Sequence, residues 1–430
     1  MIASDYFIRL VCNLGFMQLS LFDNPNNELP AGNGNITAEA LFEAYFTCRK
    51  NKRNTYNALA FELDYEHNLI ELLIKINNHE YKPRRSIAFI VDKPVKREIF
   101  AADFRDRVVH HLIINKLNPL FEREFIYDNY SCRVGKGTHF GIGRADTFIR
   151  KCSENYKSDC YILKLDIQGF FMHINRQILF DRLQQFIRNK YQENDILLLT
   201  ELCKIVIFND PTKNCIIKGR KKDWEGLLDN KSLFHSPASC GLPIGNLTSQ
   251  IFANFYMNSL DHFVKSKLGI RYYGRYVDDF ILVHKDKDYL TSLITVIAEF
   301  LQSDLQLTLH PKKILLQHYN KGLQFLGAVI KPGRIYVANR TKSNFYTAIQ
   351  NQNTIVRSGK PDKSQQAHFL CSMNSYLGIL NHYKTYRLRK KMLISLSAWW
   401  LNYAYISGGI AKFVLKRKPV KKAWFKYYMN

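Results

Sequence analysis

Two adjacent aspartates, Asp278 and Asp279, constrain this chain more than any other feature of its sequence. They close the tetrapeptide Tyr276-Val277-Asp278-Asp279, which lies between the apolar runs Ile270–Tyr273 and Phe280–Val283. Two such runs around a short polar step predict a β-hairpin with the aspartates on its tight turn. Neighbouring carboxylates raise each other's pKa unless a cation neutralises them, and a divalent metal is the cation that we expect. The alternative is an Asp-rich turn that only joins two strands, because Asp favours turns.

A third carboxylate strengthens the metal interpretation. The apolar run Tyr161–Asp166 is typical of a strand, and a glycine turn with the aromatic pair Phe170-Phe171 follows it. Aspartate at the end of a buried strand is rarely structural, since buried Asp is uncommon unless it is paired or bound to metal. The sequence therefore predicts a catalytic metal centre built from Asp166, Asp278 and Asp279.

From about Leu41 to Arg389 the chain resembles the reverse transcriptases, and within them the prokaryotic branch of group II intron, retron and diversity-generating retroelement enzymes. Besides the aspartate motifs, the matching segments are, in chain order, Lys96-Arg97 with Phe104–Val109, Asn129–His139, Gly241–Gln250, Phe325–Gly327, and Asn374–Gly378 with Tyr386–Arg389. The segment Gly241–Gln250 is the most specific, because its LPxG and SQ pattern resembles diversity-generating retroelement polymerases and their unclassified, often defence-associated, relatives.

This resemblance implies an α+β right-hand polymerase fold with fingers, a palm with an antiparallel sheet, and a helical thumb. The expected domains are an N-terminal extension at 1–40, fingers at 41–160, a palm at 161–335 with an insertion at 191–237, and a thumb with a basic C-terminal tail at 336–430.

Local patterns add expectations about three segments. The segment Thr37–Tyr81 has helical periodicity, which Lys82-Pro83 should stop. The run Lys218–Lys222 is expected to be a solvated loop, with a nucleic-acid contact as the alternative. After Arg334 the chain is expected to be helical to its end.

The charge of the chain indicates a polyanionic partner. It has 62 Lys and Arg against 37 Asp and Glu, a net charge of +25, and the basic residues are spread along its whole length. A globular chain so basic is suited to nucleic acid, and its binding should be salt-sensitive. Solubility alone needs far less charge. The resemblance implies that the partners are an RNA template, a cDNA product and dNTPs, with an accessory protein or a second polymerase subunit as further candidates.

Neither a membrane span nor a signal peptide is indicated. The apolar opening Tyr6–Leu21 is interrupted by Arg9, Asn13 and Gln18, and no basic region precedes it. The nine cysteines show no CxxC pair, which argues against a zinc site and a disulfide framework. These features predict a cytoplasmic protein with reduced thiols.

The resemblance implies two-metal phosphoryl transfer. Two Mg²⁺ ions, for which Mn²⁺ is a substitute, would neutralise the phosphates and position the attacking 3′-oxygen. Asp166 and Asp278 are expected to bridge the two ions, with Asp279 in support and the carbonyl of Ile167 as a further ligand.

Residues expected to bind the incoming nucleotide are Arg97, Phe171, Ile244, Gly245, Gln250 and Lys313. Arg97 resembles the fingers arginine that holds the triphosphate, a role that suits a planar guanidinium with five donors; a surface charge is the alternative. Phe171 occupies the position of an aromatic gate against the ribose 2′-hydroxyl, or else belongs to the core. Lys313 resembles a lysine that protonates pyrophosphate, although Lys312 is equally placed by sequence.

Residues expected to contact primer or template are Arg133, Tyr276, Phe325, Leu326 and Gly327. Phe325–Gly327 resembles the primer-grip turn, and Tyr276 is expected to pack beneath the aspartate hairpin. Ile244 departs from the many reverse transcriptases that carry Gln at this position, because an aliphatic side chain cannot form a hydrogen bond. Diversity-generating enzymes share this departure, which predicts low fidelity; a simple packing substitution is the alternative.

The sequence as a whole predicts an RNA-directed DNA polymerase with a dedicated noncoding RNA template. Two biological roles compete: mutagenic cDNA synthesis for sequence diversification, favoured by Ile244 and Gln250, and anti-phage defence, favoured by the N-terminal extension and the insertion at 191–237. A catalytically inactive RNA-binding scaffold is the alternative from another functional class, although all three aspartates are present.

Overall fold

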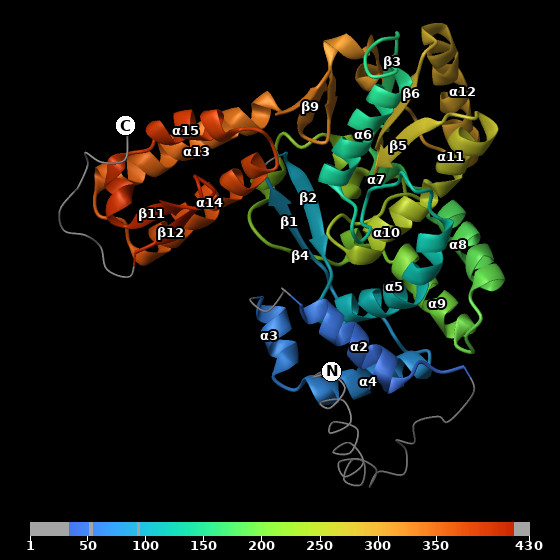
Figure 1. Cartoon of the computed structure of the whole chain (residues 1–430). Helices are drawn as coiled ribbons and strands as arrows, with labels where there is room; N and C mark the ends of the chain where they lie inside the picture. The colour runs from blue at the N-terminus through green and yellow to red at the C-terminus, as the bar shows by residue number, and fades with distance from the viewer. Residues whose placement is uncertain (1–33, 51–54, 93–94, 417–430) are drawn as a thin grey trace, which may run out of the picture. The chain divides into compact units, whose positions relative to one another are not determined.

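The computed structural model of the chain describes residues 34–50, 55–92 and 95–416, and they form an α+β structure (Figure 1). The α+β class that the sequence predicts is therefore confirmed.

The described residues divide into two compact units. The first runs up to Phe125 and resumes at Gly169–Tyr256, and the second combines Ile126–Gln168 with the residues from Met257 onward. The apolar opening Tyr6–Leu21, most of the expected N-terminal extension and the end of the basic tail lie outside the described residues. The predicted domain boundaries stay predictions.

One long helix organises the first unit. This helix, α5, packs against α2, α3, α9 and α10 and buries apolar side chains along most of its length. The helices of this unit are α2 (Ala38–Arg49), α3 (Tyr56–Glu62), α4 (Tyr65–Asn77), α5 (Phe104–Glu124), α7 (Phe170–His173), α8 (Arg176–Lys190), α9 (Ile196–Phe208) and α10 (Leu247–Tyr256).

The helical prediction for Thr37–Tyr81 is confirmed, but the last helix ends earlier than predicted. It stops at Asn77 because His79 takes a left-handed conformation with φ 60°. The backbone N–H groups of His79 and Glu80 then donate to the carbonyls of the preceding turn, which closes a Schellman motif. The helix therefore ends before Lys82-Pro83 is reached.

A three-stranded sheet lies in the same unit. Strand β1 (Ile87–Val91) pairs antiparallel with β2 (Arg97–Ala101) and parallel with the short β4 (Ile216–Ile217). Strand β4 comes from the 191–237 insertion, which also contains α9 and 3₁₀ turns at Pro211–Lys213, Lys221–Trp224, Asp229–Lys231 and Leu233–His235. The insertion therefore extends the β1–β2 hairpin. Its run Lys218–Lys222 is solvent-exposed, as predicted.

A buried carboxylate of β2 holds the insertion in place. Glu98 is 1% exposed and accepts hydrogen bonds from Trp224 Nε1 at 2.6 Å, Ser232 Oγ at 2.9 Å and the backbone N–H of Leu233 at 2.6 Å. Three donors compensate the loss of hydration of this side chain. The insertion is consequently tied to the strand that also carries Arg97.

The second unit is built on a four-stranded antiparallel sheet. Its strand order is β5-β6-β3-β7, and α12 (Lys287–Leu305) and α6 (Thr138–Cys152) pack on it. The strands are β3 (Tyr161–Asp166), β5 (Tyr272–Tyr276), β6 (Asp279–His284) and β7 (Leu315–His318). The chain reaches β5 through α11 (Asn258–His262) and a π turn at Phe263–Lys267, and 3₁₀ turns flank β7 at Pro311–Lys313 and Tyr319–Lys321.

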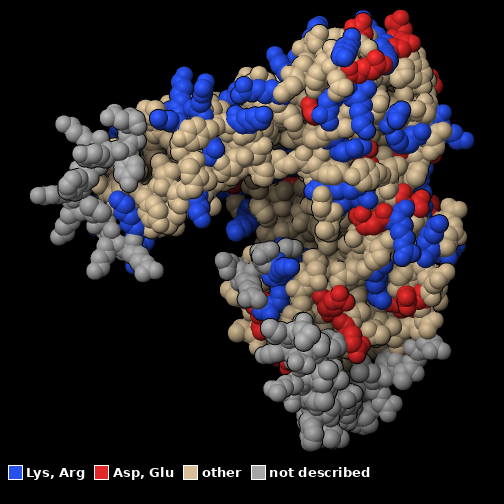
Figure 2. Space-filling view, viewed as in Figure 1, with Lys and Arg blue, Asp and Glu red and all other residues tan. Residues whose placement is uncertain are grey.

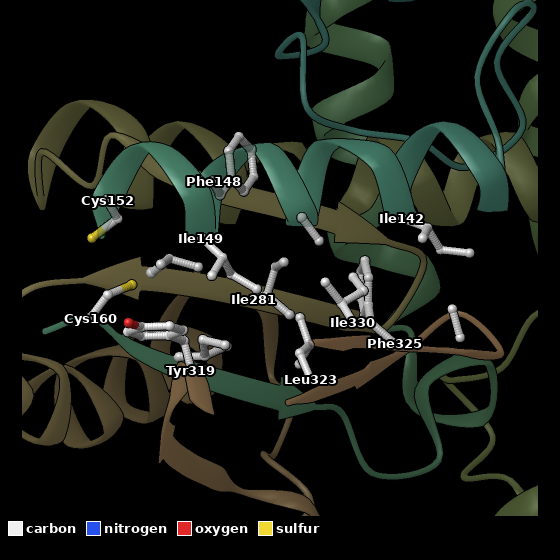
Figure 3. Close-up of a cluster of buried hydrophobic side chains, with 14 of the residues drawn as sticks. Ile142, Phe148, Ile149, Cys152, Cys160, Ile281, Tyr319, Leu323, Phe325 and Ile330 are labelled. Atoms are coloured by element: carbon white, nitrogen blue, oxygen red, sulfur yellow. The ribbon is translucent and has the colours of Figure 1, made fainter. Parts of the chain in front are cut away.

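An apolar cluster fills the space between α6 and this sheet. Ile149 and Phe148 of α6, Ile281 of β6, and Phe325 and Ile330 of the next sheet belong to it (Figure 3). The alternate side chains of β3 and β6 point to the opposite face and are buried as well. With both faces covered, the end of β3 that carries Asp166 is held rigidly.

The rest of the second unit combines strands and helices. Strands β8 (Leu323–Phe325), β9 (Ala328–Lys331) and β10 (Arg334–Val337) form an antiparallel sheet. The elements that follow pack around the buried Trp400. They are α13 (Asn339–Ser358), α14 (Lys363–Asn381), α15 (Tyr386–Ile394), a 3₁₀ turn at Ala398–Asn402, and the hairpin of β11 (Ala404–Ser407) and β12 (Lys412–Leu415). The expectation of a wholly helical C-terminal segment is therefore wrong, because β10, β11 and β12 interrupt it.

The surface is strongly basic. Lys and Arg side chains are spread over the visible face of the molecule, and acidic side chains occur in smaller groups (Figure 2). All eight cysteines in the described part of the chain are free thiols. Within residues 34–50, 55–92 and 95–416, the helices are too short or too polar to cross a membrane.

Candidate active site

The aspartate hairpin forms as the sequence predicts. Strands β5 and β6 pair antiparallel, with Tyr276 opposite Asp279, so Val277 and Asp278 make a two-residue turn and Asp279 is the first residue of β6. Val277 has φ 58°, a conformation that is costly for a β-branched side chain. Backbone strain of this kind concentrates at functional sites, which supports the view that this turn is more than a connection.

Asp166 lies directly beside this hairpin. It is the last residue of β3, and its cross-strand partner on β6 is Asp279. Directly opposed residues of an antiparallel pair project to the same face with their Cβ atoms about 5 Å apart. The fold thus brings together the carboxylates of Asp166 and Asp279, with Asp278 next in the turn.

The environment of Asp279 is unfavourable for a carboxylate without a cation. Its side chain is 22% exposed, and its Oδ1 atom is buried without a hydrogen-bond partner in the structure. Burial raises the pKa of the Asp279 carboxyl to about 6; Lys164 opposes this rise, and the charges of Asp278 and Asp166 add to it. An oxygen left unpaired in this way is what a cation ligand requires.

Two lysines partly neutralise the carboxylates. Lys313 Nζ lies 2.8 and 2.9 Å from the two carboxylate oxygens of Asp166, and Lys164 Nζ lies 3.2 Å from Asp279 Oδ2. No group of three or more His, Cys, Asp or Glu side chains in the described ranges is arranged as a ready metal cage. Mg²⁺ keeps several water ligands and also binds substrate phosphates, so it needs only a few carboxylates from the protein. Asp166, Asp278 and Asp279 therefore fit such an ion in their chemistry.

The backbone at Ile167 is compatible with a metal ligand. The carbonyl of Asp166 accepts from His310 N–H at 2.8 Å, and Gln168 N–H donates to Thr308. Ile167 is a bridge partner of Leu309 between these two hydrogen bonds. Since carbonyls alternate in direction along a strand, the carbonyl of Ile167 faces the β6 side, where the aspartates lie.

A buried ion pair fixes the aspartate turn, and the sequence did not reveal it. Arg275 and Asp261 are both fully buried, and Arg275 donates to the two Asp261 oxygens at 2.7 and 2.6 Å. The guanidinium also donates to the carbonyl of Val277 at 2.9 Å. Burial alone would lower the pKa of Arg275, but the Asp261 carboxylate outweighs it and the net pKa is raised. The charge therefore persists, and it holds the turn that carries Asp278.

Lys164 is a second residue that the sequence did not single out. It precedes Asp166 by two positions, so both project from the same face of β3. Besides its contact with Asp279, Lys164 Nζ donates to the carbonyl of Gln324 in β8 at 3.1 Å. Alternation along the strand was the available signal, but its partners depend on the register between strands that are far apart in sequence.

The burial of Asp279 leads to a prediction about stability. The folded state holds the Asp279 proton more tightly than the unfolded chain, so the free energy of unfolding falls as pH rises from about 4 to 6 and stays lower above that range. In EDTA at pH 7.5, the free energy of unfolding of Asp279→Asn should therefore exceed that of wild type by at most about 3 kcal/mol, so the variant should unfold at a higher temperature. The difference in stability should vanish near pH 4. Differential scanning fluorimetry at both pH values measures this. Equal stabilities at pH 7.5 would contradict it.

The expected nucleotide-binding residues of the first unit fall into two groups. Phe171 and Ile244 pack against one apolar cluster with Phe100 and Met172, and Phe171 accepts a backbone hydrogen bond from Leu242 at 2.8 Å. The carbonyl of Ile244 accepts from Phe100 N–H at 2.8 Å. The LPIG loop is thus fastened to both α7 and β2.

Two glycines allow this close packing. Gly169 has φ 55°, and a Cβ there would lie 2.6 Å from His173 Nδ1 and 2.7 Å from the carbonyl of Asn230. Gly245 has φ 123°, and a Cβ would lie 2.8 Å from Ile99 Cγ2. Both positions therefore require glycine, and they set the directions of Phe171 and Ile244.

Arg97 and Gln250 differ from that group in their exposure to solvent. Arg97 is exposed at the first position of β2, three residues from the Phe100 contact. Gln250 is exposed near the start of α10. The structure therefore brings Phe171, Ile244 and Gly245 together, whereas Arg97 and Gln250 have exposed side chains.

The expected primer and template residues belong to the second unit. Phe325–Gly327 closes the β8–β9 hairpin, with positive φ at Leu326 and Gly327, as a type I′ turn requires. Tyr276 packs against the apolar cluster of Figure 3, as expected for a residue beneath the hairpin. Arg133 donates to the carbonyls of Ile126 at 2.7 Å and Asn129 at 3.2 Å, so its guanidinium supports its own loop. Contact of these residues with nucleic acid stays a prediction.

Comparison with known proteins agrees with this geometry. Residues 93–330 match the family described as reverse transcriptase (RNA-dependent DNA polymerase), which is more than half of the chain. The chain therefore belongs to the reverse transcriptase family. Its fold class is the α+β right-hand polymerase fold, as the sequence predicts.

The curated relatives are distant. Protein YkfC of Escherichia coli (strain K12) is 22% identical over 255 residues, which cover 52% of this chain and 60% of that protein. Nuclear intron maturase 1, mitochondrial, of Arabidopsis thaliana is 24% identical over 123 residues, which cover 27% of this chain and 16% of that protein. The chain thus spans less than two thirds of each relative that it matches here.

Similar solved structures include two telomerases. Apo telomerase from Candida tropicalis, truncated from its C-terminal domain, has a TM-score of 0.44 and 14% identity, with 59% of this chain and 55% of that chain covered. Telomerase from Candida albicans with a TWJ fragment of telomeric RNA has a TM-score of 0.45 and 12% identity, with 79% and 59% covered.

Proposed function

We propose that this protein is an active RNA-directed DNA polymerase that adds dNTPs to a primer 3′-hydroxyl. The observation that supports it most is the cross-strand pairing of Asp166 with Asp279 next to Asp278, together with the unpaired Oδ1 of Asp279. Family membership and the net charge of +25 support an RNA template. The protein is proposed to work in the cytoplasm on a dedicated noncoding RNA.

The three aspartates and the carbonyl of Ile167 would hold two Mg²⁺ ions, or Mn²⁺ in their place. When bound, these ions supply charge neutralisation at the phosphates and at the attacking oxygen. Lys313 is paired with Asp166, and its side chain is 53% exposed. Its ammonium group at Nζ would donate a proton to the departing pyrophosphate. Arg97 would hold the triphosphate, and Phe171 would exclude a ribose 2′-hydroxyl.

The direct test is primer extension on an RNA template. We expect the purified protein to extend a primed RNA with dNTPs in Mg²⁺ and to stop on addition of EDTA. An inactive RNA-binding scaffold is the competing function; it would bind the RNA with the same salt dependence and extend nothing in either Mg²⁺ or Mn²⁺.

For the biological role, two proposals remain. Ile244 and Gln250 in the LPIG segment favour mutagenic cDNA synthesis for diversification, whereas the insertion at 191–237, which adds β4 to the β1–β2 hairpin, favours anti-phage defence. Sequencing the nucleic acid that co-purifies with the protein distinguishes them. A repeat copied with errors indicates diversification, and cDNA of one structured RNA indicates defence. Co-purification also reveals an accessory protein or a second polymerase subunit.

Ile244 carries a prediction about fidelity. Its half-buried aliphatic side chain packs on the Phe100 cluster. It would contact the nascent base pair by steric fit alone, because it cannot form a hydrogen bond. One steric misfit is worth only about 1–3 kcal/mol. Ile244→Gln should therefore lower misincorporation severalfold, most strongly opposite template adenine if the enzyme diversifies sequences. Deep sequencing of cDNA measures the errors.

The matched control for this experiment is Ile244→Leu, which keeps an aliphatic side chain of the same volume. It should leave the error spectrum of the wild-type enzyme unchanged. If the Gln and Leu variants both give the wild-type spectrum, Ile244 is a packing residue only.

A further inference from the structure

A second basic site in the second unit shares no lining residue with the site of the three aspartates. A cavity of about 670 Å³ opens where α15 begins, and its walls include Arg334, Tyr383, Lys384, Tyr386, Arg387 and Arg389. Its volume lies in the range of ligand-binding cavities. None of its lining residues is acidic, and Asp362 is the only acidic residue of the chain after Asp304.

The four cations of this cavity differ from those at the aspartates. Lys164 and Lys313 are both in ion pairs, whereas Arg334, Lys384, Arg387 and Arg389 form none with the carboxylates of the described residues. On the visible face of α13 and α15 the charged side chains are Lys and Arg (Figure 2). An uncompensated cluster of four positive charges is suited to an anion.

Arg389 is a built part of the cavity wall and not a mobile surface charge. It is 8% exposed, and its Nη1 donates to the carbonyl of Ile410 at 2.6 Å and to the side chain of Asn381. Its Nε is buried and has no hydrogen-bond partner in the structure. The buried guanidinium of Arg389 therefore adds a fixed positive charge to the wall of the cavity that it lines.

The start of α15 adds a second source of positive potential. The N-cap residue Thr385 makes no side-chain cap to the helix, and its hydroxyl donates to the carbonyl of Leu380 at 2.6 Å. The first backbone N–H groups of α15 are therefore available at the cavity, and helix N-termini bind phosphate. Tyr386, beside them, is 56% exposed and presents a flat ring to solvent.

We propose that this cavity binds one nucleotide of single-stranded RNA, with its phosphate at Lys384, Arg387 and the start of α15 and its base stacked on Tyr386. Cationic grooves with aromatic platforms recognise single strands, because each base has a face to stack. Bases in a duplex are already stacked on their neighbours and present no face to Tyr386. The site is separate from the proposed polymerisation centre, so binding here does not depend on catalysis.

The test is RNA binding by the full chain in EDTA, measured by fluorescence anisotropy with a 12-nucleotide RNA. The double variant Lys384→Gln with Arg387→Gln removes two cavity charges. Its matched control, Lys390→Gln with Lys391→Gln, removes two exposed charges from α15 outside the cavity. We expect the cavity variant to bind about tenfold more weakly than the control. The slope of log K against log salt should also fall by about 0.7 for each phosphate that the variant no longer neutralises.

Three further arms identify the ligand. Tyr386→Ala should weaken single-stranded RNA binding by about tenfold and leave an RNA–DNA duplex unaffected. A thiouridine-substituted 12-mer should crosslink to the peptide that contains Tyr386, a readout that holds even if a variant is unstable. Inorganic phosphate should compete only at millimolar concentration.

Any of three results would overturn the proposal. The cavity and control variants could lose equal affinity for RNA, Tyr386→Ala could weaken the binding of duplex and single strand equally, or micromolar phosphate could displace the RNA. Loss of polymerase activity alone has no bearing on these measurements, so failure of the proposed function would be seen separately.

Discussion

Simultaneous replacement of Asp278 and Asp279 with alanine is expected to abolish DNA synthesis while the fold stays intact. These carboxylates would hold the cations that neutralise the charge developing at the phosphate, and loss of such electrostatic stabilisation lowers rates by at least about a thousandfold. Because the Asp279 carboxyl is buried with a raised pKa, its removal should leave thermal stability unchanged or slightly higher. Primer extension on an RNA template in Mg²⁺, together with a thermal melt, measures both effects.

A control separates the site from general charge loss. Glu299 is an exposed carboxylate on α12, and Glu299→Ala should retain wild-type extension. The assignment of the aspartates would be wrong if the double variant extended the primer at a rate near that of wild type. A double variant that unfolds would instead indicate that the hairpin carboxylates are structural.

The aspartate site was predictable because its signals are local. The apolar runs on both sides of Asp278 define the hairpin, and the run Tyr161–Asp166 defines the strand beside it. What brings Asp166 and Asp279 together is the register of β3 against β6, which pairs positions more than a hundred residues apart. The position of each aspartate at the end of a strand suggested their grouping, but periodicity alone could not specify this register.

The supporting residues were not predictable for the same reason. Arg275 and Asp261 are two charged residues that a sequence pattern assigns to the surface, yet both are fully buried. Their burial is tolerated because Arg275 donates to the Asp261 carboxylate and to the Val277 carbonyl. Lys164 was visible only as a polar position in an apolar strand. Its partners Asp279 and Gln324 come from two other strands, and no local pattern specifies them.

Short strands account for the errors in the C-terminal segment. Strands β10, β11 and β12 have four residues each, too few for alternation to be distinguished from the helical pattern around them. One signal was available: Gly408 and Gly409, which both have positive φ in the β11–β12 connection, are typical of a hairpin loop. The short β4 had no such signal, because it pairs with β1, a strand far from it in the sequence.

Replacing Phe171 with alanine is expected to admit ribonucleotides. The backbone of Phe171 is fixed by the Leu242 hydrogen bond and by the turn at Gly169, and its ring packs edge-on against Phe170 with centroids 5.3 Å apart. These contacts favour one position of the ring, which would clash with a 2′-hydroxyl if the sugar lies against it. Removing it should raise GTP relative to dGTP incorporation by about tenfold or more, because the clash disappears while the groups proposed to hold the phosphates remain.

The neighbour Phe170 makes this prediction specific. It is 3% exposed, so Phe170→Ala should cost about 3–5 kcal/mol of stability through the cavity it leaves, with no change in sugar selectivity. Phe171→Ala should show the opposite pattern, with a changed GTP to dGTP ratio and a smaller loss of stability, since its ring is only half-buried. Single-nucleotide incorporation on one RNA template, measured beside a thermal melt for both variants, separates the two roles. If both variants lose stability and keep the wild-type ratio, Phe171 belongs to the core, and sugar discrimination must come from another residue.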